Sequence, residues 1–199
     1  MKSRIFILFI ILSFSACTNH ELLGKVDLEP ASAEWINNIN NNQCDTYKNT
    51  DGDIMHMRNA YGVTTYYNEI DYHCKKMLLH TKCETYDLQG MALSYVQDLS
   101  IKYTLQRNKS KIADWDNFNI NIRENDKQID VNKILYTSDS TLLLGESFVF
   151  LDSIDIATKR FYDVYYTKTG GDSSEVFFNK THGVVAFRMA SYSVLWIQQ

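Results

Sequence analysis

The chain is poor in the residues that interrupt regular structure, with one proline, Pro30, and eight glycines among 199 residues. A proline inside a strand removes a donor from the hydrogen-bond ladder, so this sequence can form long uninterrupted strands. It also lacks a glycine-rich phosphate-binding loop, since Gly170-Gly171 stands in an expected turn between strands. No serine stands in the G-x-S-x-G pattern of a nucleophile elbow. The sequence therefore offers no standard motif for nucleotide binding or serine hydrolysis.

Basic residues are also scarce: 20 Lys and Arg stand against 24 Asp and Glu, which gives a net charge of −4. Removal of the first 16 residues, expected below, would take away Lys2 and Arg4 and bring the net charge to −6. No basic stripe offsets this charge, so a nucleic-acid partner is not expected. A polybasic contact with lipid is not expected either.

The N-terminus begins MKSRIFILFIILSFSAC, in which Lys2 and Arg4 precede an apolar run and small residues follow it. This order is typical of a secretory signal, and the run is too short for a transmembrane anchor. Residues Phe14-Ser15-Ala16-Cys17 resemble the lipobox of bacterial lipoproteins. The resemblance implies that Cys17 is lipidated and becomes the first residue after cleavage, with acyl chains such as palmitate holding the protein to a bilayer.

We therefore expect three parts along the chain. Residues 1–16 form a signal peptide, residues 17–28 the lipidated cysteine and a tether, and residues 29–199 a single β-rich domain. The expected location is the cell membrane or outer membrane, with the domain lipid-anchored outside the cytoplasm. An ordinary signal peptide with a chance cysteine is the alternative.

Three cysteines remain beyond the lipobox, at Cys44, Cys74 and Cys83. An exported protein meets an oxidising compartment, so a disulfide is expected, and Cys74–Cys83 is the preferred pair by proximity. Free thiols at all three positions are the alternative. His73 and His80 add soft metal ligands nearby, but the spacing matches no common zinc knuckle, and no metal site is assigned.

The stretch 91–107, MALSYVQDLSIKYTLQR, alternates apolar and polar side chains, which is typical of a strand with one buried face. Its apolar face carries Leu93, Tyr95, Leu99, Ile101, Tyr103 and Leu105. The phase breaks at Val96 and Gln97, which predicts a bend or bulge. The run is longer than a usual strand. We therefore expect a mainly β fold, with a curved antiparallel sheet or incomplete barrel; a two-sheet sandwich is the alternative.

A short N-terminal helix is expected to open at Pro30, with Trp35, Ile36 and Ile39 on one face. Asparagines at 37–42 limit it to about two turns. The near-continuous apolar run 142–151 is expected to be a buried strand. Other strands are expected at 54–58, 63–67, 118–122, 129–131, 161–167, 175–179, 184–189 and 194–197.

The segment 177–187, FFNKTHGVVAF, resembles a strand–turn–strand element near the C-terminus of many small cell-envelope lipoproteins of the Bacteroidetes. In those proteins two aromatic residues, an Asn-Lys pair and a glycine precede an apolar strand, and a tryptophan strand follows, as Trp196 does here. The resemblance covers residues 162–196 together with the lipobox. It implies lineage and β architecture, and it brings no catalytic residue.

Candidate catalytic and metal-binding groups are weak. Residues 49–53, NTDGD, suggest a calcium loop, but an EF-hand register would put Tyr47 and Arg58 at ligand positions, so a hairpin turn is expected instead. Cys44 lies among asparagines without a glycine frame, although His56, His73, His80 and His182 are available to activate it. No catalytic residue, cofactor or metal is assigned.

The expected function is that of a cell-envelope lipoprotein with a non-enzymatic binding or interaction module. Its expected partners are the membrane, through the anchor, and a protein or an apolar ligand. The alternatives are an envelope hydrolase and a carrier of an apolar ligand such as lipid. Tyrosines could line a ligand cavity or simply occupy half-buried strand positions; they are Tyr61, Tyr66, Tyr67, Tyr72, Tyr162, Tyr165, Tyr166 and Tyr192.

Overall fold

The computed structural model describes residues 27–40, 44–68, 72–87, 99–109, 113–124, 127–145, 148–168, 174–189 and 194–199. Within these ranges it describes no side chain for residues 40, 44, 58–87, 109, 124, 144 and 145. Cys17 and the whole segment 1–26 lie outside the described residues, as do 91–98 of the central apolar stretch.

Strands dominate the described chain, with one α-helix and one 3-10 helix beside them. The helices are α2, Pro30–Asn40, and η1, Ser140–Gly145. The strands are β1 Cys44–Asn49, β2 Ile54–Asn68, β3 Tyr72–Asp87, β4 Leu99–Lys109, β5 Asp114–Glu124, β6 Lys127–Thr137, β7 Val149–Ile156, β8 Lys159–Lys168, β9 Glu175–Asn179, β10 Gly183–Arg188 and β11 Trp196–Gln198.

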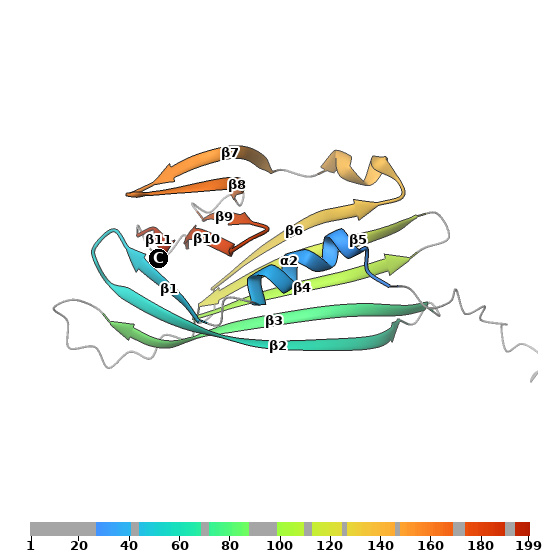
Figure 1. Ribbon diagram of the computed structural model, residues 1–199, viewed down its shortest axis with the longest axis horizontal. Coiled ribbons are helices and arrows are strands. Elements are labelled where there is room, and N and C mark those ends of the chain that lie inside the picture. The colour runs from blue at the N-terminus through green and yellow to red at the C-terminus, as the bar shows by residue number, and fades with distance from the viewer. Residues whose placement is uncertain are drawn as a thin grey trace, which may run out of the picture.

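All these strands form one antiparallel sheet, in the order β6-β5-β4-β3-β2-β1-β11-β10-β9-β8-β7. The sheet curls so that β7 and β8 lie above β4 and β5, with α2 between them (Figure 1). It does not close into a barrel: β6 and β7 are its two edge strands. The expected curved antiparallel sheet with a short N-terminal helix is confirmed, and the sandwich alternative is wrong.

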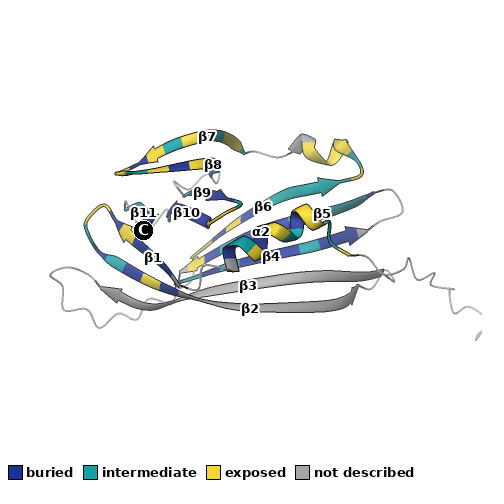
Figure 2. Ribbon diagram, in the orientation of Figure 1, coloured by how far each residue is buried: buried dark blue, intermediate teal, exposed yellow. Residues whose placement is uncertain are grey.

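The main core fills the concave side of this sheet. Trp35, Ile36 and Ile39 of α2 are buried there, as their helical spacing predicts. The helix runs for eleven residues, about three turns instead of two, because asparagine weakens a helix only slightly when the opposite face is docked. Figure 2 shows buried residues along β4 and β5 and on α2, which lies beside these strands.

The central apolar pattern is confirmed where the structure describes it. Leu99, Ile101, Tyr103 and Leu105 of β4 are almost completely buried. The hairpin expected around 118–131 is also present as β5 and β6, with Phe118, Ile120 and Ile122 on the buried face. Period-two alternation identified these faces because each strand has one side on the core.

The strands expected at 54–58 and 63–67 are confirmed, but they are parts of one strand, since β2 continues through Gly62, which pairs with Leu78 of β3. A glycine weakens a strand without ending it when both neighbours hold the ladder. The chain turns earlier, at 49–53. There Asn49 Oδ1 accepts hydrogen bonds from the backbone N–H groups of Asp51 and Asp53, at 3.0 and 2.8 Å, which confirms the expected turn.

A second, smaller core lies on the other face of the C-terminal strands. It holds Ile156, Phe161, Val164, Val185, Ala186 and Ile197. Because β10 contributes Val184 and Phe187 to the main core and Val185 and Ala186 to the second, it is buried on both faces. This strand therefore connects the two cores. No helix within the described ranges is long and apolar enough to span a bilayer.

Candidate functional site

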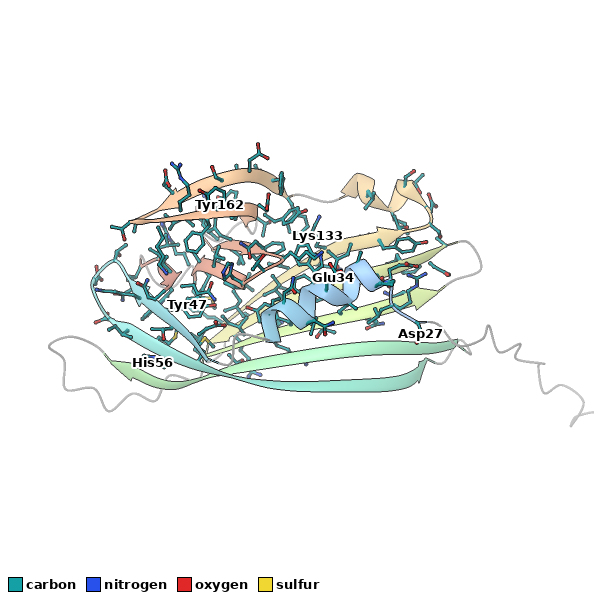
Figure 3. All side chains as sticks on the ribbon, viewed as in Figure 1. Asp27, Glu34, Tyr47, His56, Lys133 and Tyr162 are labelled. Atoms are coloured by element: carbon teal, nitrogen blue, oxygen red, sulfur yellow. The ribbon has the colours of Figure 1, made fainter. Side chains whose placement is uncertain are left out.

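The open side of the sheet, between its edges at β6 and β7, is the most distinctive feature of the described surface. Lys133 on β6 places its Nζ atom 4.3 Å from the ring centre of Tyr165 on β8 and 5.2 Å from that of Phe148. Phe150 lies 5.1 Å from Tyr165, centre to centre. We call Lys133, Phe148, Phe150 and Tyr165 the seam, because these side chains bridge the two edges where backbone pairing stops; Figure 3 labels Lys133 there.

The seam rests on the aromatic core. Trp35 of α2 lies 5.1 Å from Phe118 of β5 and 5.8 Å from Tyr165, which puts one indole in contact with both ends of the curled sheet. Phe178 of β9 stacks at 5.6 Å on Tyr165. These tilted and offset distances are in the favourable range for aromatic pairs. The seam therefore packs, through Tyr165, on a buried aromatic core that includes Trp35 and Phe178.

The large apolar side chains that are exposed in the described residues lie on η1, β7 and β8. They are Leu142 and Leu143 of η1, Val149 and Phe150 of β7, and Tyr162 of β8. Val149 and Phe150 are each about half exposed, at 52 and 49%. Adjacent exposed apolar side chains on an edge strand, as at Val149 and Phe150, favour contact with another molecule.

The prediction made for the apolar run 142–151 does not agree with the structure. The apolar run 142–151 was expected to be one buried strand, and this is wrong: it forms η1, then the start of an edge strand whose residues face solvent. An apolar run without periodicity does not distinguish a buried strand from other structures. Gly145 and Glu146 inside the run were the local signal of an interruption.

A buried polar cluster lies inside the sheet instead of at its surface. Asp45 of β1 accepts a hydrogen bond from Gln198 Nε2 at 3.0 Å, and burial raises the pKa of Asp45 to about 6. Burial also raises the pKa values of Tyr47 and Tyr103, and the nearby Asp45 carboxylate adds to both shifts. Perturbed pKa values can mark active sites. Here the side chains are at most 5% exposed, so a substrate would have to enter the core, and we assign them a structural role.

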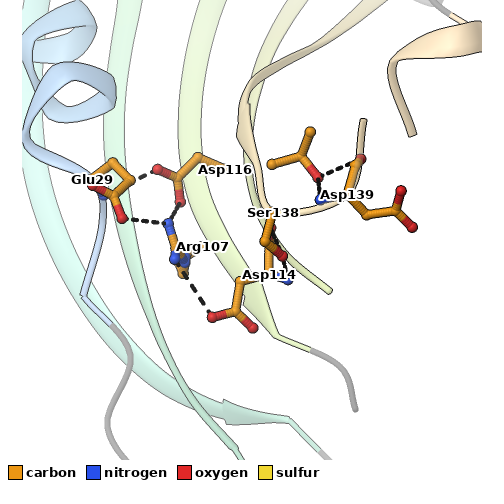
Figure 4. Close-up of polar contacts among 7 residues, drawn as sticks. Glu29, Arg107, Asp114, Asp116, Ser138 and Asp139 are labelled. Atoms are coloured by element: carbon orange, nitrogen blue, oxygen red, sulfur yellow. Dashed lines mark hydrogen bonds and ion pairs between the residues drawn. The ribbon is translucent and has the colours of Figure 1, made fainter. Parts of the chain in front are cut away.

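A second charged cluster fixes the start of α2 (Figure 4). Arg107 of β4, with 7% of its side chain exposed, contacts carboxylate oxygens of Asp116, Glu29 and Asp114 at 3.3, 3.5 and 3.6 Å. The backbone N–H of Glu29 donates to Asp116 Oδ2 at 3.0 Å. Burial lowers the pKa of Arg107, but the three carboxylates raise it above its usual value overall. The cluster combines one cation with three carboxylates, a formal charge of −2, and holds α2 against β4 and β5.

Two histidines have described side chains, His56 and His182. His56 Nδ1 is 3.0 Å from the Thr46 hydroxyl on an exposed part of β2. His182 lies in the turn before β10, where burial and the nearby Lys159 lower its pKa. Within the described residues, no three His, Cys, Asp or Glu side chains gather in a way that could hold a metal.

The structure does not describe the side chains of the site residues that the sequence analysis named. Cys17 is outside the described residues, and so are the side chains of Cys74, Cys83, His73 and His80. The backbone carries Cys74 and Cys83 in the same strand, β3, nine residues apart. Nine residues of extended strand span about 30 Å, against a Cα separation of about 7 Å at most for a disulfide. A bond between them would require β3 to be broken.

The candidate tyrosines with described side chains differ in their surroundings. Tyr165 belongs to the seam, while Tyr166 donates to Glu175 at 3.1 Å. Tyr162 is exposed, and the side chains of Tyr61, Tyr66, Tyr67, Tyr72 and Tyr192 are outside the described set.

Comparison with protein-family models, with curated proteins and with solved structures finds no match for this chain.

Proposed function

We propose that this protein is a lipid-anchored lipoprotein of the bacterial cell envelope whose β domain, residues 29–199, is a non-enzymatic binding or interaction module. The proposed anchor is Cys17, and it is supported by the order of basic start, apolar run, small residues and cysteine. The likeness of residues 177–187 to lipoproteins of the Bacteroidetes supports the same assignment.

The observation that carries the binding role is the exposure of Val149 and Phe150 on β7, an edge strand of the sheet. Phe150 is half exposed and lies against Tyr165, which contacts the buried Trp35, so an exposed aromatic surface continues into the core. Rigid aromatic groups bind at low entropic cost, because few side-chain torsions have to be fixed. An edge strand also offers unpaired backbone groups to a partner.

The concave side of the sheet is less suited to binding. Trp35, Ile36 and Ile39 of α2 already occupy it, so an apolar ligand there would have to displace the helix. The carrier alternative is therefore less favoured than binding at the seam. The hydrolase alternative is less favoured as well, because the Asp45 carboxylate is enclosed in the core and the buried Arg107 is ion-paired with carboxylates that hold α2 in place.

The anchor is tested by replacing Cys17 with Ala, labelling cells with palmitate and separating membranes from soluble fractions. We expect the label and the membrane retention to be lost. Cys44→Ala is the matched control, because it removes a cysteine outside the lipobox, and it should keep both. A Cys17→Ala protein that is labelled and retained like its parent would refute the anchor.

The binding face is tested with a photo-crosslinking amino acid at position 150, in place of Phe150, in the full-length protein in cells. We expect a discrete adduct that is lost when Lys133, another residue of the seam, is also replaced by Glu. The control position is Lys127, exposed on the other end of β6, which should give no adduct. Equal labelling from both positions would show that the seam has no special binding role.

A further inference from the structure

The N-terminal segment joins the sheet at the same end as η1. Residue Glu29 is tied to β5 through Asp116, and the first residue of β5, Asp114, is tied to Ser138. The backbone N–H of Asp114 donates to Ser138 Oγ, and the Ser138 N–H donates to the Asp114 carbonyl, both at 2.9 Å. Since η1 begins at Ser140, two residues after Ser138, these hydrogen bonds and the start of β5 between them connect Glu29 to η1 (Figure 4).

The turn of η1 is held in place by its own polar contacts. Asp139 Oδ1 accepts from the backbone N–H and the hydroxyl of Thr141, at 2.9 and 2.8 Å, and the Asp139 carbonyl accepts from the Leu142 N–H at 3.2 Å. Leu142 and Leu143 are 38 and 43% exposed on this turn. Two adjacent leucines are therefore presented to solvent on a fixed support.

The length of the tether restricts where this end of the molecule can be. Cys17 precedes Asp27 by ten residues, which reach about 35 Å at full extension. Asp27 and Tyr162 lie toward opposite ends of the molecule in Figure 3. An anchor in the bilayer therefore holds Asp27 within about 35 Å of the lipid surface, so the Asp27 end, with η1, is able to reach that surface.

We propose that Leu142 and Leu143 of η1 insert into the interfacial region of the bilayer that holds the Cys17 anchor, and so orient the domain on the membrane. This inference rests on the proposed lipid anchor. Exposed apolar side chains next to a lipid surface gain free energy by leaving water. Two leucines are too small a patch for the roughly 800 Å² per partner of a stable protein interface, which favours lipid as the occupant.

The test uses the full-length lipidated protein in phosphatidylethanolamine–phosphatidylglycerol vesicles that contain lipids brominated near the headgroup, which quench tryptophan on contact. Leu143→Trp adds a reporter to η1, and the unsubstituted protein, with its three tryptophans, gives the background. Tyr162→Trp is the matched control, because it is also exposed but lies at the far end. We expect emission loss beyond background from L143W and none from Y162W.

Each other outcome has one meaning. Quenching absent from L143W, in protein that still sediments with the vesicles, would overturn the η1 contact and leave the anchor intact. Equal quenching of L143W and Y162W would also overturn it, because the membrane would then lie along the whole β7–β8 face. Protein that does not sediment with the vesicles would refute the anchor, and with it the proposed function.

Discussion

The phenol oxygen of Tyr103 on β4 accepts a hydrogen bond from the backbone N–H of Val184 on β10, at 3.0 Å, across the concave interior of the sheet. Tyr47 of β1 donates to the carbonyl of the same residue at 2.7 Å. The register between β9 and β10 shifts between Val184 and Ala186, so the ladder is irregular there. Two tyrosines from distant strands thus satisfy the backbone groups of a β-bulge, which a buried bulge requires.

Replacing Tyr103 with Phe should lower the free energy of unfolding by about 1–3 kcal/mol, because the buried Val184 N–H loses its acceptor. Urea unfolding followed by circular dichroism gives the value. The control is Tyr162→Phe, whose hydroxyl belongs to a residue that is 61% exposed and should have almost no effect. Equal effects of the two substitutions would contradict the role assigned to the Tyr103 hydroxyl.

Gly183→Ala should destabilise the protein by about 2–4 kcal/mol, from backbone strain and overpacking together. Gly183 has φ of +73°, and an added Cβ would lie 2.7 Å from Tyr103 Oη and 2.9 Å from its Cζ. The double variant with Tyr103→Phe should cost less than the sum of the single changes, because part of the clash is removed. Strict additivity would show that strain at φ alone explains the loss.

Much of the fold was predictable because single strands have one buried face. Phe118, Ile120 and Ile122 alternate in the sequence and are fully buried in β5, and Trp35 and Ile36 mark the docked face of α2. These patterns are local, and burial on one side is enough to impose them. The turn at 49–53 was equally local, since the Asn49 side chain bonds to backbone groups only a few residues away.

The seam was not predictable from such patterns. Lys133 and Tyr165 meet only because the sheet curls through the ten strands from β6 to β8 and brings β6 opposite β8. Curvature depends on the sum of twists and bulges, such as the shift at His56/Met57 in the β2–β3 pair, and no short stretch encodes it. Arg107 and Glu29, 78 residues apart, meet for the same reason.

Asp45 should make stability depend on pH between about 4 and 6. Burial raises its pKa in the folded protein from 3.8 to about 6, and the hydrogen bond from Gln198 offsets this only partly. Between these values the folded state binds more protons at this group than the unfolded chain, so its contribution to stability is full below pH 4 and is lost as pH rises through 6. The loss amounts to about 3 kcal/mol at most.

The measurement compares urea unfolding of the parent and of Asp45→Asn at pH 4, 5, 6 and 7. Asparagine keeps an acceptor for Gln198 but cannot ionise, so the variant should gain stability relative to the parent as pH rises through this window. The gain should level off above it. A constant difference, or one that shrinks with pH, would contradict the raised pKa of Asp45.

Arg107→Met should cost about 3–5 kcal/mol, because it leaves the fully buried carboxylate of Asp116 without its cation. The contrast is Arg160→Ala, which breaks a shorter ion pair to Asp155, at 2.7 Å, between exposed side chains. Water already solvates those charges, so the unfolding transition should stay within experimental error. Adding Asp116→Asn to Arg107→Met should restore part of the loss. Similar costs for Arg107 and Arg160 would contradict the structural role of the Arg107 cluster.

Continuous pairing of β1, β2 and β3 predicts that Cys44, Cys74 and Cys83 are free thiols. Cys74 and Cys83 lie about 30 Å apart along β3. Cys44 pairs with Arg58, and Arg58 pairs with Lys82, so Cys44 and Cys83 are separated by two strand spacings, close to 10 Å. A disulfide needs Cα atoms within about 7 Å. Thiol titration of the denatured, unreduced mature protein should therefore find three thiols per chain, with Cys17 blocked by lipid. Mass spectrometry that mapped a Cys74–Cys83 bond within one chain would show that β3 is not continuous.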